Sequence, residues 1–419
     1  MGDLFGTAVV LDSEFHMTTY ARKPVMFVRG KGMRLFDDDG REYLDFVAGI
    51  GAVNLGHAHP AVTEAICEQA AKLTHVSNLY HVEHRAELAC DLAELLATSA
   101  AAAQSWRAGR PAPGPDSSQW RLFFCNSGAE AIEGAIKLAR KWGHETRGVD
   151  CHRIVTAERS FHGRTLAALA ATGQPSKQET FEPLPSGFSH VPLNDLRALE
   201  AAVDDRTCAV LLEPVQGEGG IYPCEPEYLE AVRRLCDERG MLLILDEVQT
   251  GFYRTGTPFA FEEYGVVPDV VCMAKSLANG LPAGALAARG EAAHVFKPGD
   301  HGSTFGGGPL VCAAARATIA ALAAEELGRN AAEAGTYLRE RLHAFAADTG
   351  RVAEVRGVGL MNALEFTEPV AGEVALGGLA RGLVLNNIGA HILRILPPLV
   401  CGHGEIDTLV EALYELSAP

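Results

Sequence analysis

The sequence predicts an α/β fold in which a large domain holds a mostly parallel sheet and a smaller domain is of the α+β type. Between residues 120 and 290, short apolar runs alternate with helical segments. Strands that alternate with helices usually form a parallel sheet covered by helices. The expected strands are Arg121–Cys125, Arg153–Ala157, Cys208–Glu213, Met241–Asp246, Val270–Ala274 and Ala283–Ala288.

The length of the chain and its later part indicate more than one domain. A chain of 419 residues exceeds what one hydrophobic core usually supports. After Gly299, helices are expected at Leu310–Leu327 and Ala331–Ala347, followed by short strands within 354–366 and 391–396. The expected parts are an N-terminal segment at 1–50, a large domain at 51–299 and a small C-terminal domain at 300–419.

Two other stretches need separate interpretation. Strands are expected within Phe27–Phe46, and they should pack with the small domain. The stretch Ala97–Gln119 contains an alanine run followed by Pro, Gly and Ser residues, which predicts an exposed excursion between a helix and the first strand. No chemistry is assigned to it.

Composition and charge exclude several classes of protein. The formal charge of −17 argues against binding nucleic acid, which needs a basic surface. No apolar run reaches the roughly 18 residues that a membrane span requires, and the N-terminus is acidic where a secretory signal is basic. The ten cysteines are scattered singly and are expected to be reduced thiols. We therefore expect a cytoplasmic protein without a nucleic-acid or membrane partner.

The first chemical motif is N-S-G-A-E-A at Asn126–Ala131, directly after an expected strand and at the start of a helix. Ser127 and Glu130 have the spacing of a capping box. The small residues Gly128 and Ala129 leave the N–H groups of the helix start accessible, so the motif predicts a phosphate site. An ordinary capped helix is the alternative interpretation.

Two further motifs place a carboxylate and an amine at strand ends. The apolar run Leu242–Gln249 contains Asp246, which could bind a metal, cap a helix or pair with a cationic nitrogen. The run Val270–Pro282 contains Lys275 where the strand ends. Surroundings that favour a neutral lysine amine make it a nucleophile for carbonyl groups, whereas a lysine that merely reaches solvent from the strand end is the alternative.

Together the three motifs match the needs of pyridoxal phosphate: an amine for its aldehyde, a carboxylate for its ring nitrogen and a helix start for its phosphate. N-S-G-A-E-A, S-F-H-G-R-T, E-P-V-Q-G-E-G-G, D-E-V-Q-T-G, A-K-S-L-A-N-G and H-G-S-T-F-G-G follow one another in this chain as in class III aminotransferases, which the sequence resembles over nearly its whole length. The resemblance implies a fold-type I architecture and a homodimer with active sites at the subunit interface.

The resemblance also implies roles for individual residues. Lys275 would carry the cofactor covalently and then move the proton between substrate and cofactor, while Asp246 would keep the ring nitrogen protonated. The other expected cofactor-binding residues are Ser127, Gly128 and Ala129 at the phosphate, Thr304 reaching it from the other subunit, Phe161 and Val248 on the two ring faces, Gln249 near the ring hydroxyl, and Glu213 and His162 beside the ring.

The expected substrates are an amino donor and 2-oxoglutarate. Arg164 and Arg394 match the two arginines with which such relatives bind carboxylates, a task that suits the charged guanidinium fork. Glu218 matches a glutamate that covers the second arginine when the donor has no carboxylate there. Surface ion pairing is the alternative for both arginines.

The stretch D-F-V-A-G-I-G-A-V-N-L-G-H-A-H-P and the tetrapeptide Ser77–Tyr80 are most similar to members of the family that use N2-acetylornithine. Asn78, together with Ser303, would meet the acyl amide of that donor. The implied reaction yields N-acetylglutamate 5-semialdehyde and glutamate, as in arginine biosynthesis. The alternatives are a donor such as ornithine, succinyl-diaminopimelate, 4-aminobutyrate or lysine, and an aminomutase.

Two other patterns are given no function. His57 and His59 form an H-x-H pair, but no third ligand cluster follows, so no metal site is expected. The glycines of Gly217–Gly220 lack the full G-x-G-x-x-G pattern and the helix that a dinucleotide site requires.

Overall fold

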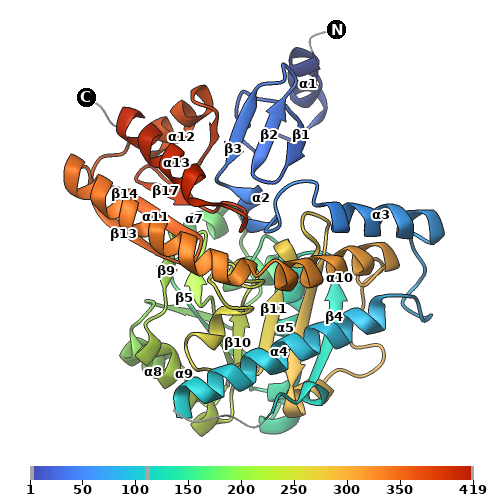
Figure 1. The fold of residues 1–419 in the computed structure, drawn as a ribbon. Helices are drawn as coiled ribbons and strands as arrows, with labels where there is room; N and C mark the ends of the chain where they lie inside the picture. Colours follow the sequence, from blue (N-terminus) through green and yellow to red (C-terminus); the bar gives the residue numbers. More distant parts are fainter. Residues whose placement is uncertain (1–3, 109–113, 417–419) are drawn as a thin grey trace.

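A computed structural model describes residues 4–108 and 114–416 of the chain, and a seven-stranded sheet forms its centre (Figure 1). The strand order is β4-β12-β11-β10-β7-β5-β6, and only β12 runs antiparallel to its neighbours. The α/β fold is therefore confirmed. The strands are β4 (Trp120–Cys125), β5 (Arg153–Ala157), β6 (Phe188–Val191), β7 (Thr207–Leu212), β10 (Leu242–Asp246), β11 (Val270–Met273) and β12 (Gly284–Arg289).

Helices cover both faces of this sheet, which explains its apolar strands. Every residue of β7, β10 and β11 is buried, as expected for parallel strands with both faces covered. Ile244 packs with α5 (Gly128–Arg147) on one face, whereas its neighbours Leu243 and Leu245 pack with α9 (Pro226–Arg239) on the other. This alternation fixes which strand residues point toward each helix layer.

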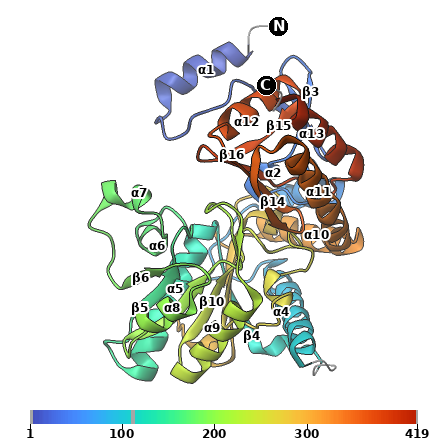
Figure 2. The same cartoon turned by 90° about the vertical axis from the view of Figure 1, so that its left-hand side faces the viewer.

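The two chain ends build a second region above the sheet (Figure 2). An antiparallel sheet in the order β13-β14-β17-β16 comes from the C-terminal part, and β15 pairs in parallel with β3 of the N-terminal strands. Residues 27–46 are thus joined to the C-terminal part through the pairing of β3 with β15. The strands are β1 (Phe27–Lys31), β2 (Arg34–Asp37), β3 (Glu42–Asp45), β13 (Val352–Val358), β14 (Met361–Phe366), β15 (Leu383–Val384), β16 (Asn386–Ile388) and β17 (Ile392–Ile395).

The remaining regular elements are mostly helices. A short hairpin of β8 (Val215–Gln216) and β9 (Tyr222–Pro223) follows β7. The other α-helices are α1 (Leu4–Phe15), α2 (Ala48–Gly51), α3 (Pro60–Lys72), α4 (Arg85–Ala108), α6 (Leu166–Ala171), α7 (Pro175–Gln178), α8 (Leu196–Ala202), α10 (Pro309–Ala324), α11 (Leu327–Thr349), α12 (Ala371–Ala380) and α13 (His403–Leu416). None of the helices in the described ranges is long and apolar enough to cross a membrane.

The structure corrects part of the predicted pattern. The alanine run within 97–119 is not an exposed excursion, because α4 continues through it and buries Ala97 and Ala103. Residues 109–113 of that stretch lie outside the described residues. Strand β6 was not expected, since its four residues F-S-H-V are too short for a clear pattern. The division at residues 50 and 299 stays a prediction.

A buried arginine joins the region above the sheet to the sheet itself. Arg254, in the loop after β10, has 0% exposure and donates hydrogen bonds to Asn54 Oδ1 (2.6 Å) and to the carbonyl oxygens of Leu360 (3.0 Å) and Pro397. All three acceptors are uncharged, so the arginine satisfies carbonyl groups that would otherwise be buried without partners. Arg254 therefore holds the N-terminal and C-terminal segments against the loop that follows Asp246.

Candidate active site

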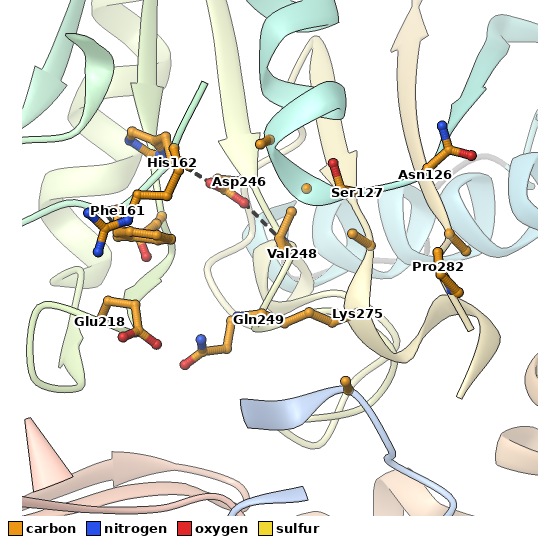
Figure 3. Close-up of a pocket in the computed structure, with 18 of the residues that line it drawn as sticks. Asn126, Ser127, Phe161, His162, Glu218, Asp246, Val248, Gln249, Lys275 and Pro282 are labelled. Carbon is orange, nitrogen blue, oxygen red and sulfur yellow. Dashed lines mark hydrogen bonds and ion pairs between the residues drawn. The ribbon is translucent and has the colours of Figure 1, made fainter. Parts of the chain in front are cut away.

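A cavity of about 440 Å³ opens where β5, β10 and β11 end (Figure 3). Its position beyond the carboxyl ends of parallel strands is where sites in α/β sheets lie. Three of the sequence motifs contribute to its wall, which includes Ser127, Gly128, Ala129, Phe161, His162, Glu213, Glu218, Asp246, Val248, Gln249 and Lys275. The structure thus brings together all but one of the predicted cofactor-binding residues, Thr304 being the exception.

The phosphate seat is the first turn of α5. Ser127 caps this helix, since its hydroxyl accepts a hydrogen bond from Glu130 N (3.2 Å). The Glu130 carboxylate does not return to Ser127 as a full capping box would, but accepts from Asn126 N and Nδ2, both at 2.9 Å. A Cβ at Gly128 would lie 2.9 Å from Val248 Cγ1, so glycine is needed for the helix start to pack this closely against Val248. The helix start offers N–H groups to an anion.

Asp246 is held by two hydrogen bonds at the bottom of the cavity. Its Oδ2 lies 2.8 Å from His162 Nδ1, and its Oδ1 accepts from Val248 N at 3.1 Å. His162 Nε2 in turn lies 3.1 Å from the hydroxyl of Thr156, so both ring nitrogens have partners. Both side chains are buried, with 5% exposure for Asp246. Because His162 fixes one carboxylate oxygen, Asp246 has a defined orientation toward the cavity.

Lys275 directly follows Ala274 at the end of β11, where it adopts a left-handed backbone conformation with φ of 46°. Its side chain lines the cavity (Figure 3). Burial lowers the pKa of its amine to about 8, and the charge of Arg394 acts in the same direction, against the opposing effect of Glu218 and Asp246. A lysine with this pKa is partly neutral near pH 8, which makes it available as a nucleophile and as a base.

Glu213 and Gln249 form another part of the wall. Glu213 accepts hydrogen bonds from Phe161 N (3.0 Å) and Gly217 N (3.1 Å), and burial raises its pKa to about 7. The amide oxygen of Gln249 is buried and has no hydrogen-bond partner among the described residues. A buried acceptor without a partner is costly, so a donor group of a bound molecule would satisfy Gln249.

Glu218 and Arg394 form an ion pair at the rim of the cavity. Burial opposes the charge of Glu218, but the charge and hydrogen bond of Arg394 outweigh this effect and lower its pKa. Arg394 also donates to Asn386 Oδ1 through Nε (3.0 Å) and Nη2 (2.6 Å). Arg164, in contrast, is exposed and forms no ion pair within the described part of the chain. Its guanidinium carbon lies 5.6 Å from the ring centroid of Phe161.

The remaining predicted residues lie in a second pocket of the same chain. Asn78, Ser303 and Thr304 line this pocket. Asn78 donates hydrogen bonds to the carbonyl oxygens of Ser303 (2.8 Å) and Gly306 (3.0 Å), so these segments are held together. Thr304 does not line the cavity that contains Lys275.

Some residues at the site carried no clear signal in the sequence. Asn126 lines the cavity and reaches Ser303 Oγ at 3.3 Å, yet in the motif it only precedes the cap. Thr156 lies within an apolar strand, and its hydroxyl forms a hydrogen bond with the ring of His162, six positions later in the sequence. Within the described ranges, no group of three or more His, Cys, Asp or Glu residues could hold a metal ion.

Comparison with known proteins decides the family. The model of the family "Aminotransferase class-III" matches residues 17–416. The chain is a class III aminotransferase. It is 46% identical to the acetylornithine aminotransferase of Caldanaerobacter subterraneus over 97% of this chain and 98% of the relative, and 49% identical to that of Gloeobacter violaceus over 95% and 94%. The structure of an ornithine aminotransferase from Toxoplasma gondii, described with PLP at its active site, matches with a TM-score of 0.87 at 32% identity, covering 98% of this chain and 94% of that one.

Class III aminotransferases are PLP-dependent transaminases, and the cavity fits that cofactor. The start of α5 lines the cavity and suits a phosphate, and Gln249 offers an unpaired buried acceptor. Lys275 supplies an amine with a lowered pKa, and Asp246 is a buried carboxylate of fixed orientation. These groups come from the start of α5, the end of β10 with its following loop, and the turn after β11, and they meet only in the folded chain.

Proposed function

We propose that this class III aminotransferase transfers the distal amino group of N2-acetylornithine to 2-oxoglutarate. The observation that carries the proposal is the pair of arginines at the rim: Arg394 is neutralised by Glu218, whereas Arg164 is free to bind a carboxylate. A donor with one carboxylate fits this arrangement. The names of the relatives with 44–49% identity support the same donor.

We assign the cofactor contacts to the residues of the cavity. The N–H groups of Gly128 and Ala129 and the hydroxyl of Ser127 would hold the phosphate, and Phe161 and Val248 would enclose the ring. Gln249 would donate to or accept from the ring hydroxyl, with Glu213 and His162 behind the ring. Bound PLP supplies an aldehyde for the amine and a ring that accepts electrons.

Two residues of the chain perform the proton chemistry. Asp246, oriented by His162, would hold a proton on the ring nitrogen of bound PLP. The amine of Lys275 would move the proton between the substrate carbon that bears the amino group and the cofactor. The lowered pKa of Lys275 suits this task, because its neutral amine is the form that accepts a proton.

The rim would serve the two half-reactions in turn. The Arg164 guanidinium binds the α-carboxylate of the donor. Asn78 and Ser303 lie with Thr304 in the second pocket, so they would meet the acyl amide from the other subunit. For 2-oxoglutarate, Glu218 turns away and Arg394 binds the second carboxylate. Glu218 can release Arg394 because it is a side chain at the rim with 27% exposure rather than a fully buried partner.

The donor assignment predicts a preference for the acylated amine. N2-acetylornithine should exceed ornithine in kcat/KM by at least about tenfold, a factor that one misplaced polar group supplies. Burial and the charge of Arg164 lower the pKa of Lys177, while Glu218 acts in the opposite direction. A free α-ammonium held beside Arg164 would likewise meet the charge of that guanidinium. The test follows the cofactor spectrum after each donor is added alone.

Arginine variants complete this test. Arg164→Ala should raise the KM of the donor strongly, while Arg329→Ala, an exposed arginine on α11, should leave it unchanged. If ornithine or 4-aminobutyrate converts the cofactor faster than N2-acetylornithine does, the donor assignment is wrong. Ornithine is the specific rival, since the matching Toxoplasma gondii structure is an ornithine aminotransferase. An aminomutase would need no 2-oxoglutarate.

We also propose a homodimer with shared active sites. The support is that Thr304 lies in a second pocket, away from Lys275 of its own chain. In the dimer, Thr304 of one subunit would reach the phosphate held by the other.

The ten cysteines are all free, which supports a reducing compartment and a location in the cytoplasm.

The shared site predicts recovery of activity in hybrids. Chains with Lys275→Ala and chains with Thr304→Glu should each be nearly inactive alone, because one lacks the amine and the other repels the phosphate. A hybrid dimer has one site with both defects and one site with neither, so mixing should restore activity. Subunit exchange is verified by native mass spectrometry, and exchanged hybrids without activity would refute the shared site.

A further inference from the structure

The turn that carries Glu218 is held by a residue with no part in the chemistry. Glu218 lies at the tip of the β8–β9 hairpin, between residues whose backbones are fixed. On one side, Gly217 N donates to Glu213 Oε1 at 3.1 Å. On the other side, the carbonyl oxygen of Gly220 accepts a hydrogen bond of 2.8 Å from Arg356 Nε. The backbone of the turn is therefore held on both sides of Glu218.

Arg356 and Arg394 occupy one row of the C-terminal sheet. Arg356 on β13 pairs with Ala363 on β14, and Ala363 pairs with Arg394 on β17. Directly paired residues in antiparallel strands point to the same face of the sheet, so both arginines face the hairpin. Their backbones are two strand spacings, or about 10 Å, apart. Arg394 binds the Glu218 side chain and Arg356 binds the backbone two residues later.

The small residue between the arginines lets the hairpin approach the sheet. Ala363 is fully buried and packs with Val215 and Ile221 of the hairpin region. At Gly220, with φ of +124°, a Cβ would lie 2.8 Å from Ile392 Cδ1, so the contact leaves no room for a side chain. The turn is thus seated directly on the row that contains Arg394.

Arg356 itself is fixed in place. Its side chain is 6% exposed and forms ion pairs with Glu354 (2.8 Å) and Glu365 (2.7 Å). Its guanidinium also lies over the ring of Tyr222, at 4.1 Å from the centroid. With its charge balanced by two carboxylates, Arg356 can position the turn without competing with Arg394 for Glu218.

We propose that Arg356 is a positioning residue that sets the strength of the Glu218–Arg394 ion pair by holding the turn over the C-terminal sheet. Arg356 thereby controls how well the enzyme distinguishes two kinds of amino donor: one that places no carboxylate at Arg394, and one whose second carboxylate binds there. Without Arg356 the turn can move, Glu218 neutralises Arg394 less completely, and an amino acid with a second carboxylate gains access. This inference rests on the proposed use of Arg394 for carboxylates.

The test compares the kcat/KM of the holoenzyme for N2-acetylornithine with that for glutamate. Arg356→Met should lower the ratio of the two values by about fivefold, through a lower KM for glutamate and with kcat for glutamate preserved. Arg356→Lys keeps the charge but loses the Nε–H donor, so an intermediate ratio is expected, and it serves if Arg356→Met does not fold. Arg381→Met, which removes a surface ion pair to Glu415, should leave the ratio unchanged.

A double variant separates this inference from the proposed function. Glu218→Gln alone should lower the ratio, and adding Arg356→Met should lower it no further, because both changes act on one ion pair. A lowered ratio in Glu218→Gln with a wild-type ratio in both Arg356 variants overturns the positioning role. Additive effects also overturn it. An unchanged ratio in Glu218→Gln itself overturns the proposed handling of carboxylates, and the role of Arg356 with it.

Discussion

Replacing Lys275 by alanine is expected to abolish transamination, with a loss of at least about a thousandfold in kcat, because the chain loses its nucleophilic amine and its proton carrier together. Among the residues that line the cavity, Lys275 supplies the one ammonium group. The measurement is the rate of each half-reaction, followed through the cofactor spectrum. A Lys141→Ala variant is the control, since Lys141 is a surface residue that pairs with Glu145.

Covalent labelling tests the same residue independently. Purified enzyme should be yellow, and borohydride should leave the cofactor attached to a peptide that contains Lys275. The neighbourhood of Lys275 favours this reaction, because burial lowers the pKa of its amine to about 8 while an ordinary lysine remains protonated at that pH. Recovery of the label on another lysine, or substantial turnover by Lys275→Ala, would contradict the assignment.

Asp246→Asn should retain much of the cofactor binding but lose well over about tenfold in kcat, or more than about 1.4 kcal/mol of transition-state stabilisation. A neutral amide holds a protonated ring nitrogen poorly, whereas the shape of the side chain is preserved. The His162 contact at 2.8 Å allows the amide to keep its place. Cofactor content is measured by absorbance and kcat by the coupled reaction.

The control for Asp246→Asn is Asp237→Asn, which removes a carboxylate with 65% exposure on α9. This variant should keep the wild-type kcat and cofactor content. Near-wild-type turnover by Asp246→Asn would remove the carboxylate from the mechanism. Loss of both cofactor and activity would instead indicate that Asp246 acts mainly in binding.

The sequence by itself determined the central sheet and most of the cavity. Continuous apolar runs predicted six of its seven strands to within one residue at each end, because strands buried on both faces contain few polar residues that would interrupt the apolar pattern. β6 was missed because four residues carry too little periodicity. The alanine run in α4 was misread, since alanine is compatible with both a buried helix face and an exposed linker.

The motif residues were predictable because each one sits at a local transition from strand to helix or loop. Asp246 is the last residue of an apolar strand, and Ser127 and Lys275 each lie two residues beyond one. The carboxyl ends of parallel strands meet at one edge of the sheet. The resemblance to class III aminotransferases added roles that spacing alone left open. The pairing of Glu218 with Arg394 likewise matched an expectation taken from the family.

Only the tertiary structure decided which partners support these residues. His162 meets Asp246 across 84 positions in the chain, and Arg356 meets Gly220 across 136. Arg254 meets Leu360 across 106 positions and Asn54 across 200. No local sequence pattern encodes such contacts, because they arise from the strand order and from the packing of the chain ends over the central sheet. In that packed interior a buried polar group is stable only when a residue distant in the sequence completes its hydrogen bonds.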